Sequence, residues 1–382
     1  MKILHLIIDH QVIERTLNVF EEVFPLQNDV IIFSDTNRYK HLDKYSKSFR
    51  VDSQNVQSMA NSYDFSLVKY VVCHYLTFDM IDFIKLIPNE IHVSWEIYGF
   101  DLYNQFLEKF GMKLYAHDTP YDHLWHSTLR KHFPRLYDFG LFLKGHRKQT
   151  THYARKAFNY ITRRINSVGV ACRNDLKLLE SFSGLKYDFY DFCNYSLEET
   201  LGELYYADYS KGSHILVGNS ASFSNNHLYI LDNIKILNNK DDLNLVLVLS
   251  YGGIPEYRDK VMRAYEAIFS SNVKFITSYI PLNEYNKSFL MYNSMILSSW
   301  RQESIGTILM GFHLGIKVYM SQVSPLYSFY KDLGFSLFTI ESDDILHINE
   351  PLSNDIRKKN RDLLHELYND DIIKSYIRQH FK

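Results

Sequence analysis

The chain has 382 residues, which is long enough for two domains of ordinary size, each with its own hydrophobic core. Its 42 lysine and arginine residues nearly balance its 44 aspartate and glutamate residues, and this balance argues against a general nucleic-acid-binding protein. The three cysteines, Cys73, Cys172 and Cys193, are too few and too widely spaced for a disulfide framework or a metal site, so a reducing cytoplasm fits them best. No apolar run approaches the roughly 18–20 residues of a membrane-spanning helix.

Short apolar runs alternate with amphipathic segments along nearly the whole chain, which is the pattern of parallel α/β sheets. The apolar run at the start is too short for a signal peptide and is expected to form a buried first strand. In the first half we expect strands at residues 3–8, 30–33, 68–73, 91–95 and 168–171. We expect helices there at residues 14–24, 78–87, 101–110 and 174–182.

A polar, tyrosine-rich stretch at residues 194–211 is expected to connect this half to a second α/β alternation. The second set of strands is expected at residues 214–217, 243–249, 273–277, 295–297, 316–320 and 337–339. Its helices are expected at about 225–237, after Pro255, and as two charged helices within 352–381. These patterns predict domains at residues 1–205 and 213–345, followed by C-terminal helices at 346–382. Two such halves facing each other leave a cleft, with ligands at the carboxyl ends of the strands.

Three loops of the second half each follow a predicted strand and contain small or polar residues. These residues are Gly218, Asn219 and Ser220; Ser250, Tyr251 and Gly252; and Arg301, Glu303, Gly306 and Thr307. The Gly-Thr turn opens a helix, so its backbone amides and the helix dipole favour an anion there. An arginine, bare amides and a carboxylate suit a nucleotide diphosphate. The arginine and the amides would bind the phosphates, and the carboxylate would bind the ribose hydroxyls. The alternative is three ordinary strand-to-helix turns with a surface ion pair.

The corresponding loops of the first half contain candidates for a general acid or base. They are Asp9, His74, Glu96 and Asp101. Each of them also has a structural explanation, because Asp101 can cap the helix that follows it and His74 can be a hydrogen-bonded buried histidine. The pattern leaves open which of the four is the base.

The stretch at residues 144–164 is locally basic. Within it, Phe158 and Ile161 are expected to share one helix face, with Tyr153 and Tyr160 nearby. Basic charge beside an apolar stripe suits docking on an anionic membrane surface. A solvated basic helix is the alternative.

Four places in the chain resemble the bacterial TDP-N-acetylfucosamine:lipid II N-acetylfucosaminyltransferases, or 4-alpha-L-fucosyltransferases, which serve enterobacterial common antigen assembly. They are residues 215–220 with 224–227, residues 98–103, residues 301–307 and, more loosely, Asp9 with residues 15–16. In two positions the chain departs from that family, since Glu96 stands in place of a histidine and Tyr98 in place of a tryptophan. Residues 121–164 also align poorly. These departures lie on the presumed acceptor side, so they leave the acceptor and the donor sugar open.

The resemblance implies a GT-B glycosyltransferase, an α/β protein with two Rossmann-like domains whose parallel sheets face an interdomain cleft. The C-terminal domain would bind a nucleotide diphosphate sugar, with TDP as its nucleotide. The N-terminal domain would bind an undecaprenyl-diphosphate-linked saccharide at the cytoplasmic face of the cell membrane. The enzyme would then be cytoplasmic and peripherally attached to that membrane through residues 144–164, with no nucleic-acid partner.

The leading interpretation is transfer of a deoxyamino sugar or fucose, with Arg301 and the amides of Gly306 and Thr307 holding the diphosphate. The cleft loops contain no Asp-x-Asp triplet, so we expect no metal and no cofactor. Two alternatives stay open, a sugar-nucleotide 2-epimerase of the same architecture and a non-catalytic scaffold that binds nucleotide sugars.

Overall fold

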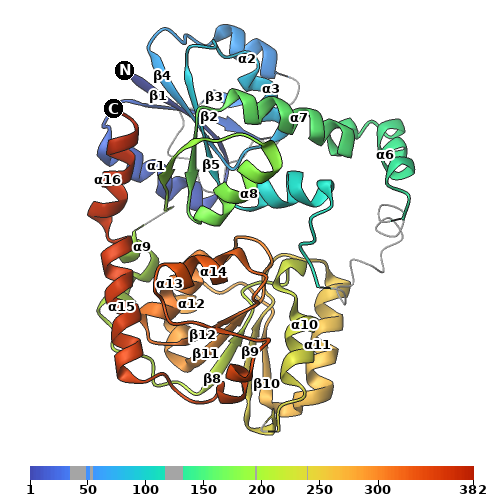
Figure 1. Cartoon of the computed structure of the whole chain (residues 1–382), viewed down its shortest axis with the longest axis vertical. Coiled ribbons are helices and arrows are strands. Elements are labelled where there is room, and N and C mark those ends of the chain that lie inside the picture. The colour runs from blue at the N-terminus through green and yellow to red at the C-terminus, as the bar shows by residue number, and fades with distance from the viewer. Residues whose placement is uncertain (35–48, 52–54, 117–131, 194–195, 239) are drawn as a thin grey trace. The chain divides into compact units, whose positions relative to one another are not determined.

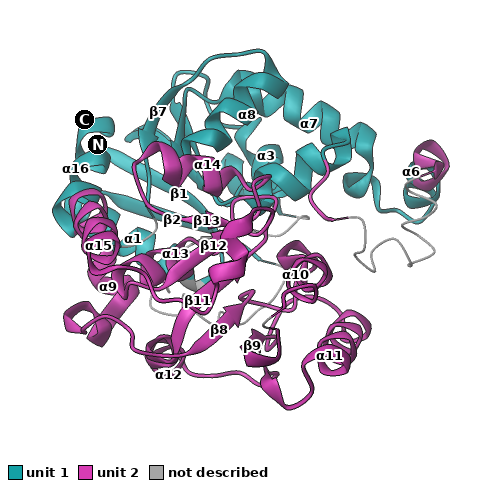
Figure 2. Cartoon of the chain, turned by 60° about the horizontal axis from the view of Figure 1, so that its bottom comes forward, with its two compact units in different colours: residues 1–112, 138–196, 370–382 teal, residues 113–137, 197–369 magenta. Residues whose placement is uncertain are grey.

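The computed structural model describes residues 1–34, 49–51, 55–116, 132–193, 196–238 and 240–382. They form two compact units (Figure 2). Unit 1 comprises residues 1–112, 138–196 and 370–382, and unit 2 comprises residues 113–137 and 197–369. Each unit contains one parallel sheet with helices packed on it, as the alternating sequence pattern predicts.

Unit 1 is built on a seven-stranded parallel sheet with the order β3-β2-β1-β4-β5-β6-β7 (Figure 1). The strands are β1 (Lys2–Ile8), β2 (Asn28–Phe33), β3 (Phe49–Val51), β4 (Val68–His74), β5 (His92–Ile97), β6 (Ser167–Val170) and β7 (Asp188–Asp191). Five of them are predicted, whereas β3 and β7 are not. The edge strand β7 has the sequence DFYD and only Tyr190 in it is buried, so it lacks an apolar run.

The helices of unit 1 pack around its sheet. They are α1 (Gln11–Val23), α2 (Val56–Ser62), α3 (Phe78–Ile84), α4 (Phe100–Leu102), α7 (Thr151–Arg164), α8 (Arg173–Ser183) and α16 (Asp370–His380). A further helix, α6 (Pro134–Leu143), begins in unit 2 and ends in unit 1. The helix predicted at 101–110 is interrupted, because a π-helical turn (Tyr103–Leu107) and a 3₁₀ turn (Glu108–Phe110) follow α4.

Unit 2 is built on a six-stranded parallel sheet with the order β10-β9-β8-β11-β12-β13. The strands are β8 (His214–Val217), β9 (Asn244–Val248), β10 (Val273–Ile276), β11 (Tyr292–Leu297), β12 (Lys317–Met320) and β13 (Phe338–Thr339). The helices are α9 (Leu197–Leu201), α10 (His227–Ile234), α11 (Pro255–Phe269), α12 (Leu282–Ser288), α13 (Ile305–His313), α14 (Pro325–Asp332) and α15 (Asn354–Tyr368). All six strands agree with the predicted set.

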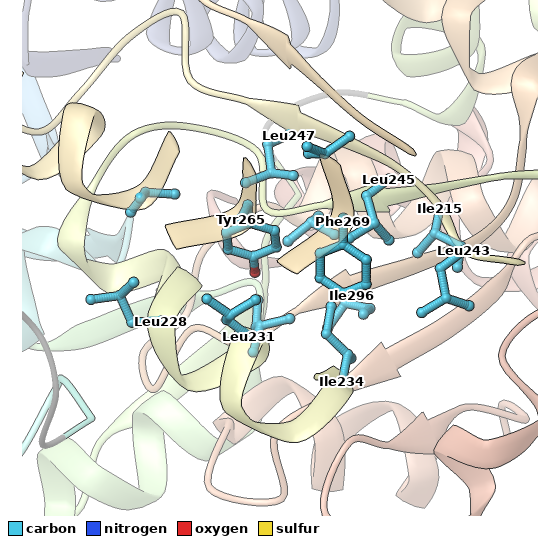
Figure 3. Close-up of a cluster of buried hydrophobic side chains, with 14 of the residues drawn as sticks. Ile215, Leu228, Leu231, Ile234, Leu243, Leu245, Leu247, Tyr265, Phe269 and Ile296 are labelled. Atoms are coloured by element: carbon cyan, nitrogen blue, oxygen red, sulfur yellow. The ribbon is translucent and has the colours of Figure 1, made fainter. Parts of the chain in front are cut away.

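The core of unit 2 shows why its strands can be predicted. Leu245 and Leu247 of β9 and Ile296 of β11 pack with Tyr265 and Phe269 of α11 (Figure 3). Strands of a parallel sheet that helices cover on both faces are continuous apolar runs, and such runs are easily recognised.

In both sheets the strand order reverses next to the first strand of the unit. The reversal lies between β1 and β4 in unit 1 and between β8 and β11 in unit 2. Open parallel sheets bind their ligands at such a switch point, at the carboxyl ends of the strands. Among the helices of the described residues, none is both long enough and apolar enough to cross a membrane.

Candidate functional site

The switch point of unit 2 brings together the three loops that follow β8, β9 and β11. The amide of Ala221, after β8, donates to the carbonyl of Tyr251, after β9, at 2.7 Å. The side-chain amide of Asn226 donates to the carbonyl of Ser298, after β11, at 2.8 Å. The predicted donor residues therefore lie at one edge of the sheet, on these loops and, for Gly306 and Thr307, in the first turn of α13.

The loop after β8 turns at Gly218, whose φ is +66°. A Cβ atom at this position would lie 2.7 Å from Nε2 of His227 and 2.9 Å from Oδ1 of Asn225. Asn225 holds the turn, because its Oδ1 accepts from the amide of Asn219 at 2.8 Å and its Nδ2 donates to Oγ of Ser220 at 3.0 Å. Glycine is thus required here for both conformation and space.

The loop after β9 packs on the first loop through two glycines. Gly252 has a φ of +72°, and a Cβ atom there would lie 2.3 Å from Oγ of Ser222. The hydroxyl of Tyr251 accepts from Nδ2 of Asn219 at 3.4 Å, and the Tyr251 side chain is exposed. Ser250, which precedes it, is half-buried.

The loop after β11 contains a partly buried ion pair. Nη2 of Arg301 lies 3.3 Å from Oε2 of Glu303, and the two side chains are 13% and 14% exposed. The hydroxyl of Ser299 donates to the same carboxylate oxygen at 3.1 Å, and this hydrogen bond helps to fix the position of Glu303.

The start of α13 presents backbone amides at this loop. Its N-cap, Ser304, has a φ of +66°, and no side chain of the described residues caps the helix there. The first turn contains Gly306 and Thr307, and the Thr307 hydroxyl lies against the phenol of Tyr285. A small pocket at this end is lined by Asn225, Ser298, Ser299, Glu303, Ser304 and Ser324 among others.

Several buried polar atoms around this switch point have no hydrogen-bond partner within the described residues. They are Oδ1 of Asn219, Oγ of Ser224, Nε2 of His227, Oγ of Ser298 and Oε1 of Gln302. Buried polar groups in proteins are nearly always paired, so a cluster of unpaired ones indicates a place where a polar ligand binds. The sequence prediction missed Asn225, Asn226 and Ser298, although an Asn-Asn pair after a strand is typical of a turn with positive φ.

In unit 1, two of the predicted acid–base residues belong to a buried polar network. Nδ1 of His74 is paired with Oε2 of Glu96, and its Nε2 lies 2.9 Å from Nδ1 of His5. The other Glu96 oxygen accepts from the hydroxyl of Tyr190 at 2.9 Å. Nε2 of His5 lies 3.0 Å from Oδ1 of Asn28. Burial, with a smaller contribution from His74, lowers the pKa of His5 to about 3, so His5 is neutral.

Asp101 is also buried, and it accepts three hydrogen bonds. The amides of Tyr98 and Leu76 and the indole of Trp95 donate to its carboxylate at 3.0, 3.1 and 2.8 Å. Burial raises the pKa of Asp101 to about 6 in spite of these donors. Asp9 differs from the other three candidates, because it directly follows β1 at the switch point and is only half-buried.

The predicted basic stretch contains α7, whose apolar face is part of the core of unit 1. Phe158 and Ile161 share this face as expected, but they are 3% and 0% exposed. Phe158 packs on Phe106 and Phe110 at centroid distances of 5.3 and 5.2 Å. The prediction of an apolar stripe available to a membrane is therefore wrong for α7, since intramolecular packing already covers it.

The described side chains contain no group of three or more His, Cys, Asp and Glu residues that could hold a metal ion. The expectation that the protein works without a metal stays a prediction.

Comparison with known proteins gives a family and a fold. The sequence model of the family described as 4-alpha-L-fucosyltransferase, glycosyl transferase group 56, matches residues 170–374. Among curated proteins, none matches the sequence significantly.

Several solved structures are similar over nearly the whole chain. Anabaena HepE in complex with UDP and glucose has a TM-score of 0.60 at 11% identity, with 98% of each chain covered. Sucrose-phosphate synthase from Thermosynechococcus elongatus has a TM-score of 0.64 at 10% identity, covering 99% of this chain and 98% of its own. The lipopolysaccharide outer core galactosyltransferase WaaB has a TM-score of 0.60 at 12% identity, covering 99% of this chain and 98% of its own. At these identities the similarity shows the fold alone, which is the GT-B fold of glycosyltransferases.

Proposed function

The chain belongs to the 4-alpha-L-fucosyltransferases of glycosyl transferase group 56, and we propose that it transfers a deoxyamino sugar or fucose, such as N-acetylfucosamine, from a TDP-linked donor to an undecaprenyl-diphosphate-linked saccharide. Family membership makes it a glycosyltransferase. The nucleotide, the sugar and the acceptor are our proposal. One observation carries it, namely the cluster of an arginine, helix amides and unpaired buried polar atoms at the switch point of unit 2.

The donor diphosphate is proposed to bind Arg301 and the first amides of α13. As the sugar leaves, negative charge grows on the terminal phosphate, and a fixed arginine and a helix N-terminus stabilise that charge. Glu303 holds the arginine at 3.3 Å and offers its remaining acceptor capacity to the ribose hydroxyls. The turn at Gly218 brings the backbone close to the ligand. A side chain at position 218 would collide with His227.

On the acceptor side, Asp9 is the proposed base. His74, Glu96 and Asp101 are fully buried, whereas Asp9 is half-buried and directly follows β1 at the switch point. Asp9 would take the proton of the acceptor hydroxyl while that oxygen bonds to the anomeric carbon. The bond from this carbon to the phosphate oxygen breaks, and TDP leaves with the electron pair. The result is inversion at that carbon.

We further propose that the enzyme works in the cytoplasm at the inner face of the cell membrane, in assembly of a surface polysaccharide such as enterobacterial common antigen. A polyprenyl-linked acceptor stays in the membrane, so its saccharide must be reached from the surface.

The test is a transfer assay with TDP-N-acetylfucosamine and a detergent-dispersed polyprenyl-diphosphate saccharide, in the presence of EDTA. Mass spectrometry should detect the extended saccharide in equimolar amount with TDP. Conversion of the donor sugar without an acceptor would support an epimerase instead, and donor binding without turnover would support a scaffold. Activity that EDTA abolishes and manganese or magnesium restores would contradict metal-independent transfer.

A further inference from the structure

The helix α6 exposes a run of large apolar side chains that no part of the proposed chemistry uses. Leu136, Phe139 and Phe142 are each 57% exposed, Leu143 is 68% exposed, and Phe133, just before the helix, is 61% exposed. No residue of α6 is buried. We infer that α6 is a membrane-docking element that inserts into an anionic bilayer. This inference rests on the proposed function in one respect only, namely that docking would give the enzyme access to a lipid-linked acceptor.

Three of the exposed apolar side chains of α6 share one side of the helix. Leu136, Phe139 and Leu143 have the spacing i, i+3, i+7 that places residues on one helical face, with Phe142 beside them. Asp138 lies on the side away from Leu136 and Leu143. Its carboxylate accepts from the amide of Thr151 at 2.9 Å and from the Thr151 hydroxyl at 3.5 Å, at the start of α7. Asp138 therefore ties α6 to the start of α7, whereas Leu136, Phe139 and Leu143 are exposed.

The charge around α6 is complementary to anionic lipid. Residues 132–164 contain eight lysine or arginine residues and one aspartate, whereas the whole chain has a net charge of −2. Arg135, Lys144 and Arg147 are exposed on or next to α6. Lys148 is paired with Asp79 and, at 2.7 Å, with Asp82, so it adds less to this charge.

These features favour a lipid surface over a second copy of the chain. Self-association through α6 would bring two strongly basic segments together, which costs energy unless acidic groups face them. At ten residues α6 is about 15 Å long, too short to span a bilayer but long enough to lie in the headgroup region with its rings in the acyl boundary.

The experiment measures sedimentation of the full-length protein with vesicles of phosphatidylethanolamine and phosphatidylglycerol, and with vesicles of phosphatidylcholine alone. The triple variant Leu136→Ser/Phe139→Ser/Leu143→Ser removes the apolar face. A matched control, Leu67→Ser/Ile236→Ser/Leu346→Ser, changes three aliphatic side chains that are 64%, 74% and 50% exposed elsewhere. We expect the triple variant to bind anionic vesicles about 100-fold more weakly, given the apolar area withdrawn from water on insertion. The control should bind like the wild type.

A second variant tests the charge. Reversal of Arg135, Lys144 and Arg147 to glutamate should remove the preference for phosphatidylglycerol, with a loss of at least about fivefold per basic residue. Unchanged binding of the triple serine variant, or no binding by the wild type, would overturn the inference. A wild-type dimer in lipid-free buffer that the serine variant converts to monomer would identify a second copy as the occupant, and would also overturn it.

The outcome is separable from that of the proposed function. Vesicle binding is measured without donor or acceptor, and transfer is measured with a short-chain, water-soluble acceptor. The serine variant should retain full transfer to that acceptor. If the wild-type protein binds vesicles but shows no transfer, the proposed activity is refuted and the membrane-docking inference is not.

Discussion

Three non-glycine residues with positive φ flank the two switch points. Asn226 and Ser304, at +50° and +66°, lie in the loops after β8 and β11, and Tyr75, at +58°, directly follows β4. Such conformations cost about 1–3 kcal/mol each and cluster at functional sites. Their positions agree with a donor site in unit 2 and with acceptor groups in unit 1.

Replacement of Gly218 by alanine should damage both stability and donor binding. The new Cβ atom would lie 2.7 Å from Nε2 of His227, in addition to the cost of a φ of +66°. We expect the free energy of unfolding to fall by about 2–4 kcal/mol, as strain and overpacking add together. Chemical denaturation measures this change.

Gly184 provides the matched control, because its φ is +70° and a Cβ atom there would meet nothing within 4 Å. Gly184→Ala should cost only about 1–2 kcal/mol and leave donor affinity unchanged. Equal losses in the two variants would show that the contact with His227 is unimportant.

Asp9 and Asp101 should respond differently to conversion to asparagine. Asp101→Asn replaces an acceptor oxygen that buried donors require, so unfolding should become easier by about 1–3 kcal/mol while the folded enzyme keeps its turnover. Asp9→Asn should destabilise the protein less than Asp101→Asn does, because Asp9 is only half-buried, and should lower the transfer rate about 10²–10⁴-fold. Full activity of Asp9→Asn in the transfer assay would remove it as the base.

At the scale of elements, the buried network of unit 1 depends on strands that are far apart in sequence. His5 of β1, His74 of β4, Glu96 of β5 and Tyr190 of β7 form one connected row. β6 lies between β5 and β7, and Tyr190 reaches Glu96 only because β6 contributes Gly169 at that point. A Cβ atom on Gly169 would lie 2.8 Å from Cγ of Glu96 and 2.8 Å from Cζ of Tyr190.

Gly169→Ala should therefore separate Tyr190 from Glu96 and destabilise unit 1 by about 1–3 kcal/mol through overpacking. Gly140→Ala is a suitable control, since a Cβ atom there meets nothing within 4 Å and alanine favours a helix. Thermal unfolding distinguishes the two, and an unchanged midpoint for Gly169→Ala would mean that the network relaxes without cost.

How much of this could be predicted from sequence depends on the kind of information involved. Apolar runs predicted all six strands of unit 2, and glycine and polar residues after β8, β9 and β11 predicted loops that the sheet brings together. The sequence pattern also placed Phe158 and Ile161 on one face of α7. Periodicity does not reveal what covers a helix face, so the expected membrane stripe proved to be core. The pairing of His74 with Glu96 depends on strand register, which a local pattern does not contain.

At the scale of the whole molecule, the two units should differ in their response to acid. In unit 2, burial lowers the pKa of His227 to about 3 and that of His313 to about 4. Both are neutral in the folded state and protonate in the unfolded state below about pH 6.5, so the stability they contribute is lost as the pH falls from there. Each contributes about 1.4 kcal/mol per pH unit across this window.

In unit 1 the buried groups oppose one another. His5 behaves like the histidines of unit 2, but burial raises the pKa of Asp101 to about 6 and that of Asp175 to about 7. Between about pH 4 and these raised pKa values, the carboxyls are protonated in the folded state and ionised in the unfolded state, so acid favours folding in that window. Hydrogen exchange at about pH 7 and pH 5, corrected for the intrinsic rate, should show unit 2 losing protection first. Earlier loss in unit 1 would contradict this assignment.

Nucleotide binding by unit 2 is the claim on which the proposed function depends, and thermal unfolding with TDP, UDP, GDP and CDP in turn, without metal, examines it. A ligand at a hundred times its dissociation constant adds about 2.7 kcal/mol, which raises the midpoint by several degrees. We predict a shift selective for TDP that Arg301→Ala abolishes and that Arg263→Ala, a change of an exposed arginine on α11, preserves. No shift with any nucleotide, or the same shift in Arg301→Ala, would contradict the donor site proposed at the start of α13.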